Sequence, residues 1–123
     1  MFPYDDYLKV AKDLATRKGE AYLRSSVSRA YYACFHLVRE YAMKDGVLLR
    51  GTKDEHSQVV AYLHNHSDPN LQVAGDYQSR LRKARKWCDY DAVVKHISQV
   101  SSQSLMNAEN IFSALNKKQA TSV

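Results

Sequence analysis

Residues 20–46 read EAYLRSSVSRAYYACFHLVREYAMKDG, and this stretch has the clearest periodicity in the chain. Its apolar residues recur at intervals of three and four, which is the repeat of an α-helix and not of a β-strand. The pattern predicts a helix from Glu20 to Lys44 that stops at Asp45-Gly46. On a helical projection, one apolar stripe lies within about 80° of Val27 and is expected to face the core. Its members are Leu23, Ala30, Tyr31, Cys34, Phe35, Val38, Tyr41 and Ala42.

The opposite face of the same helix has an unusual composition for a surface. A solvated helix face more often consists of Glu, Lys and Gln, whereas aromatic residues interleaved with Arg and His are typical of ligand grooves and subunit interfaces. Three interpretations are open: a solvated face that carries two tyrosines, a self-association surface, or a chemical site. The last two are compatible because two subunits can share a site. The face comprises Tyr22, Ser25, Arg29, Tyr32, His36 and Glu40.

The rest of the chain shows the same helical repeat. Four further helices are expected, at about residues 4–15, 52–63, 69–88 and 91–115. Thr52 and Glu55 have the spacing of a capping box, and Asp68 before Pro69 is typical of a cap followed by a first-turn proline. The sequence therefore predicts an all-α fold, an antiparallel bundle of four to five helices. Residues 1–116 are expected to form a single domain, and residues 117–123 a polar, frayed tail.

Composition narrows the class of protein. The chain has 123 residues, of which 45% are apolar and 25% charged, as expected for one globular domain and not for a disordered chain. Two cysteines are too few for a disulfide scaffold, and Cys34 on the apolar stripe is expected to be an inert core thiol. No apolar run approaches the ~18 residues of a membrane span, and the N-terminus lacks a signal-peptide pattern, so we expect a cytoplasmic protein without membrane contact.

Arg29 and His36 are the strongest chemical candidates, two helical turns apart on one face. Arginine can hold a phosphate and stabilise charge that develops on it, while histidine transfers protons near neutral pH, so phosphodiester cleavage would need no metal. Ser25 and Tyr32 would then position RNA. The alternative is that His36 is an ordinary polar-face or interface histidine. A second pair, Arg50 and His56, has similar spacing but spans a Gly-Thr loop.

The formal net charge of +5 permits a nucleic-acid or acidic partner without establishing one. Five cations crowd into residues 80–86, and they are either a solvated face near a helix end or a contact surface for the RNA backbone. The candidate RNA-binding residues in this segment are Arg80, Arg82, Lys83 and Lys86. No metal site is expected. The histidines at positions 56, 64 and 66 lack nearby cysteines and a helical His-x-x-x-His pair.

Two segments resemble one known family. The run Ser28-Arg-Ala-Tyr-Tyr-Ala-Cys-Phe-His36 resembles the signature of HEPN domains, in the branch marked by Ser-Arg-Ala-Tyr-Tyr-Ala. The run Arg85-Lys-Trp-Cys-Asp-Tyr-Asp91 is similar to the Arg-x-x-Ala-Asp-Tyr stretch of that branch, with Cys88 in place of the usual alanine. The resemblance covers nearly the whole chain, including a short segment with His56 between the two motifs.

The resemblance implies a four- or five-helix bundle that forms a homodimer. Many HEPN proteins are metal-independent RNases with an Arg-x(4–6)-His motif supplied by both subunits, and they occur in antiviral systems or as toxins beside small nucleotidyltransferase-like antitoxins. Arg29 and His36 match that spacing at its upper limit, although Ala30 stands where active members commonly carry a polar residue. The expected function is therefore a metal-independent RNA endonuclease that needs no cofactor. The alternative is a non-catalytic helical module that binds a nucleotidyltransferase-like partner, a nucleotide or RNA.

Overall fold

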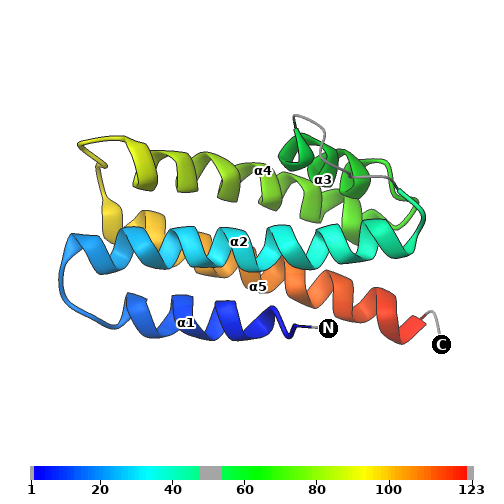
Figure 1. The fold of residues 1–123 in the computed structure, drawn as a ribbon, viewed down its shortest axis with the longest axis horizontal. Coiled ribbons are helices and arrows are strands. Elements are labelled where there is room, and N and C mark those ends of the chain that lie inside the picture. Colours follow the sequence, from blue (N-terminus) through cyan, green and yellow to red (C-terminus); the bar gives the residue numbers. More distant parts are fainter. Residues whose placement is uncertain (1, 48–53, 122–123) are drawn as a thin grey trace.

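The computed structural model describes residues 2–47 and 54–121, which form five helices packed as an antiparallel bundle (Figure 1). The predicted all-α fold is confirmed. Four long or medium helices run up and down along the bundle, and the short α3 packs against α4 beside the C-terminal end of α2 (Figure 1). The helices are α1 (Asp5–Ala15), α2 (Glu20–Lys44), α3 (Glu55–His64), α4 (Pro69–Tyr90) and α5 (Ile97–Thr121).

The helix α2 has the bounds that the sequence predicts and lies at the centre of the bundle, in contact with the other four helices. Its apolar stripe is buried as expected, apart from the partly exposed Leu23 and Tyr41. The Cys34 thiol is completely buried, and this burial raises its pKa, as expected for an inert core thiol. The buried surface is wider than the predicted stripe, since Ser26 is also fully buried and donates a 2.6 Å hydrogen bond to the carbonyl oxygen of Ala11 in α1.

Local side-chain caps explain where α3 and α4 begin. The Asp54 carboxylate accepts a hydrogen bond from the backbone N–H of Ser57, so Asp54 caps α3; Thr52 lies outside the described residues. The predicted cap of α4 is confirmed, because the Asp68 carboxylate accepts from the N–H of Asn70 and Pro69 occupies the first turn.

The last helix begins later than the sequence predicts. Helicity was expected from about Asp91, but α4 ends at Tyr90 and α5 starts at Ile97. The cause is a distant arginine. The guanidinium of Arg24 in α2 donates hydrogen bonds of 2.6–3.1 Å to the carbonyl oxygens of Cys88, Asp91 and Ala92, which holds the connection in a non-helical path.

The C-terminal end of α5 is tied to the rest of the bundle. The helix continues through Thr121, so residues 117–121, expected in a frayed tail, are helical. Within it, Lys118 Nζ lies 3.7 Å from a carboxylate oxygen of Asp45, which also accepts a 2.6 Å hydrogen bond from the Tyr62 hydroxyl. Across residues 2–47 and 54–121, none of the helices combines the length and apolar character needed to cross a membrane.

Candidate functional site

Arg29, Tyr32 and His36 form a cluster on α2 that is completed by two tyrosines near the N-terminus. The Arg29 guanidinium lies over two rings, 5.3 Å from the centroid of Tyr7 and 5.6 Å from that of Tyr32. The His36 ring lies 6.4 Å and 6.0 Å from the same two ring centroids, and it stacks on Tyr4 at 5.1 Å. The two predicted chemical residues therefore contact the same pair of tyrosine rings. We call these five residues the α2 cluster.

In the α2 cluster, the imidazole of His36 and the guanidinium of Arg29 are both available to interact with a ligand. Partial burial, together with the nearby guanidinium groups of Arg39 and Arg29, lowers the pKa of His36 below its ordinary value, so the imidazole is neutral at pH 7. Within the described part of the chain, Arg29 has no ion-pair or hydrogen-bond partner, and neither does the ring of His36. A neutral imidazole can accept a proton, and an unpaired guanidinium can bind an anion.

Tyr32 connects the α2 cluster to a second group of residues that sequence reasoning did not place there. The rings of Tyr32 and His56 meet edge to face at 6.5 Å between centroids, and the Arg85 guanidinium lies 5.5 Å from the Tyr32 centroid. The neighbouring Tyr31, which is fully buried, forms a hydrogen bond through its hydroxyl with Nδ1 of His56. A second histidine therefore lies near the first, since the rings of Tyr32 and Phe35 each lie beside both.

His56 resembles His36 in its electrostatics. Partial burial and the cations Arg82 and Arg85 lower its pKa, so it too is neutral at pH 7. Arg85 is only 6% exposed and lies 5.2 Å from the Tyr31 ring centroid. Two features of the sequence involve these residues: the segment that contains His56 and the motif Arg85–Asp91. Both are part of the resemblance to HEPN domains, and neither placed these side chains beside Tyr32. Arg50, the proposed partner of His56, lies outside the described residues.

The basic segment 80–86 does not form one surface. Arg82 points to the start of α3, where it donates to Ser57 Oγ at 3.1 Å and lies 3.4 Å from a carboxylate oxygen of Asp54. Lys86 is exposed on that side as well. Arg80 and Lys83 line an open pocket between α4 and α5, Lys83 also borders the shallower pocket of Arg82 and Lys86, and Arg85 points into the bundle. Of the candidate RNA-binding residues, Tyr32 lies under the Arg29 guanidinium and Ser25 lines a pocket with Arg29.

Ser25 lies at the edge of the α2 cluster. It is exposed and lines a separate shallow pocket with Arg29, near the last turn of α4. Among the residues that the structure describes, no three His, Cys, Asp or Glu side chains are grouped as metal ligands. Comparisons with models of protein families, with curated proteins and with solved structures returned no match.

Proposed function

We propose that the protein is a metal-independent RNA endonuclease that acts through Arg29 and His36. The observation that carries the proposal is that an unpaired guanidinium and a neutral imidazole contact the same two tyrosine rings. The resemblance of residues 28–36 to the HEPN signature supports it. Both tyrosines are partly exposed, and a partly exposed aromatic ring is a surface on which RNA bases can stack.

In the proposed reaction, His36 takes the proton from a ribose 2′-hydroxyl, whose oxygen attacks the adjacent phosphorus. The bond to the 5′ oxygen breaks, which leaves a 2′,3′-cyclic phosphate on one fragment and a 5′-hydroxyl on the other. Arg29 binds the non-bridging oxygens, where negative charge develops in the phosphorane transition state. Proton donation to the leaving oxygen requires an acid on the opposite side of the phosphate. In the proposed two-fold dimer the second copy of His36 fills this role in its protonated form, which is the minor form at pH 7.

The proposed partners follow from the same resemblance. We propose a homodimer built on the polar face of α2, where Tyr22 and Ser25 remain exposed. An antitoxin resembling a small nucleotidyltransferase is the proposed protein partner, with toxin or antiviral activity in the cytoplasm as the biological role. Light scattering should give the mass of a dimer, and a monomer at micromolar concentration would contradict this part of the proposal.

The deciding experiment is cleavage of total RNA in the presence of EDTA. Arg29→Ala and His36→Gln should each abolish cleavage, and Arg29→Lys should be nearly as damaging because lysine lacks the planar fork that grips two phosphate oxygens. Lys9→Ala and His64→Ala are controls for the loss of a cation and of an imidazole, since both residues are exposed and lie outside the α2 cluster. Circular dichroism would confirm that each variant is folded.

Full cleavage by His36→Gln, in a preparation free of contaminating RNase, would refute the proposed site. The non-catalytic alternative, in which the helical module binds RNA, a nucleotide or a partner protein, would then be preferred.

A further inference from the structure

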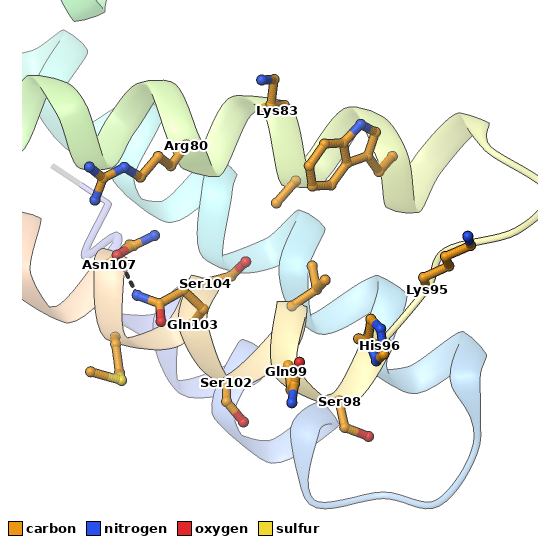
Figure 2. Close-up of a pocket in the computed structure, with 14 residues that line it drawn as sticks. Arg80, Lys83, Lys95, His96, Ser98, Gln99, Ser102, Gln103, Ser104 and Asn107 are labelled. Atoms are coloured by element: carbon orange, nitrogen blue, oxygen red, sulfur yellow. Dashed lines mark hydrogen bonds between the residues drawn. The ribbon is translucent and has the colours of Figure 1, made fainter.

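An open pocket of about 810 Å³ lies between α4 and the N-terminal half of α5, and the α2 cluster uses none of its residues. On α4 it extends from Arg80 to Trp87, and on α5 to Asn107 (Figure 2). At ~1.5 Å per residue, the α5 side from Ser98 to Asn107 is about 14 Å long. We call this pocket the α4–α5 groove.

The α4–α5 groove is lined by cations that have no anionic partner. Arg80, Lys83 and Lys95 line it, whereas no Asp or Glu side chain does. None of these three cations forms an ion pair with the described part of the chain. Figure 2 shows Arg80 and Lys95 at opposite ends of the groove, with hydroxyl and amide side chains of α5 between them. This arrangement favours a ligand with several negative charges along its length.

The groove also presents apolar surface, from Ala84, Val100, Met106 and Trp87, and Trp87 supplies an aromatic ring. Trp87 is 43% exposed, and Lys83 Nζ lies 6.0 Å from its ring centroid. An exposed indole beside a cation is suited to stack on a flat ring whose substituent is anionic.

The side chains of α5 favour one of two classes of anionic ligand. An amphipathic acidic helix could cover Val100 and Met106, but its apolar face would leave the hydroxyls and amides that α5 also presents to the groove without hydrogen-bond partners. Such groups match the hydrogen-bonding edges of nucleobases. They are Ser98, Gln99, Ser102 and Gln103.

We propose that the α4–α5 groove binds a short segment of single-stranded nucleic acid, with one base stacked on Trp87 and the phosphates held by Arg80, Lys83 and Lys95. The groove is separate from the α2 cluster, so this proposal stands whether or not the protein cleaves RNA. It assigns a binding role to Arg80 and Lys83 but not to Arg82 and Lys86, which do not line the groove although they share a neighbouring pocket with Lys83.

The single tryptophan gives a direct test, because Trp87 is the only Trp in the 123 residues. Short single-stranded RNA and DNA oligonucleotides of the same sequence should quench its fluorescence as they bind, and comparing the two shows whether the 2′-hydroxyl is read. The His36→Gln background prevents cleavage during the titration. An abasic oligomer of equal length supplies the same phosphates without bases and should quench far less. Equal quenching by the abasic oligomer would overturn the stacking assignment.

Two substitutions distinguish the contribution of base stacking to binding from the contribution of charge. Trp87→Leu keeps an apolar side chain but not the ring, and should weaken binding of a labelled oligonucleotide by about tenfold or more. Lys83→Ala should weaken binding and reduce its salt dependence by about one released counterion. Lys9→Ala, an exposed lysine on α1 that pairs with Asp5 and Asp6, is the charge-matched control and should bind as the parent does.

Two results would refute the groove as a nucleic-acid site. One is unchanged affinity in both Trp87→Leu and Lys83→Ala. The other is a dimer that Trp87→Leu converts to a monomer, since a second copy of the chain would then occupy the groove. Loss of cleavage in His36→Gln with retained oligonucleotide binding would support both proposals, while retained cleavage with retained binding would refute only the proposed active site.

Discussion

The hydrogen bond between the Tyr31 hydroxyl and His56 makes a specific prediction about stability. Tyr31 is completely buried, while His56 is partly accessible to water. Removing one partner therefore has a different cost from removing the other. In Tyr31→Phe the imidazole can bind water instead, and the loss should be about 1 kcal/mol. In His56→Ala the hydroxyl is left buried without a partner, which costs about 1–3 kcal/mol.

His56→Ala carries a second cost, because its ring stacks on Phe35 at 4.5 Å between centroids. The double variant Tyr31→Phe/His56→Ala loses that stacking but no longer buries an unpaired hydroxyl. Its destabilisation should be smaller than the sum of the two single effects by about 2 kcal/mol.

Urea unfolding followed by circular dichroism measures all three variants, at about pH 8 so that the histidines are neutral. Effects that add within about 0.5 kcal/mol would refute the reasoning. The hydroxyl would then have another partner, and the nearest suitable group is the fully buried side chain of Gln78, whose two polar atoms have no hydrogen bond within the described residues.

Three further predictions concern the rest of the bundle. The pKa of His36 is lower in the folded protein than its ordinary value of 6.5, so the unfolded chain binds its proton at higher pH. Stability should therefore be complete above about pH 6.5 and fall as the pH drops below it, and His36→Gln should lessen this fall in urea midpoints measured across the range. Asp45→Ala should cost about 1–3 kcal/mol in urea unfolding, because it leaves the hydroxyl of the buried Tyr62 unpaired, and Tyr62→Phe should cost less. A Cβ on Gly75 would lie 2.2 Å from Cδ2 of His64, so Gly75→Ala should stabilise a His64→Ala background by about 1 kcal/mol but not the parent; equal gains in both backgrounds would contradict the packing.

Short-range sequence patterns, such as apolar spacing and capping residues, predict where some of the helices begin and end. The bounds of α2 follow from the spacing of its apolar residues and from Gly46, and the start of α4 follows from Asp68 and Pro69. The start of α5 did not follow, because the Arg24 guanidinium that holds the connection lies 64–68 residues earlier in the chain. No local pattern in residues 91–96 records that long-range contact.

The candidate site was predictable only along one helix. Helical spacing places Arg29, Tyr32 and His36 on one face of α2, and the structure agrees. The rings of Tyr4 and Tyr7 reach them through the docking of α1 on α2, which depends on how two helices meet and not on the spacing within either. His56 and Arg85 arrive in the same way from α3 and α4, so two motifs that are far apart in sequence converge on Tyr32.

The position of α1 at the edge of the bundle has a consequence for access to the α2 cluster. Within the described residues this helix packs on α2 and α5 alone, and Leu8 and Ala11 are its buried residues, so its backbone amides should exchange with deuterated solvent through a partial opening of the bundle. The same opening would lift Tyr7 from Arg29 and Tyr4 from His36 while α2 to α5 remain packed. The amide-exchange rate of α1 would thus measure how often Arg29 and His36 become accessible to a ligand while α2 stays in place.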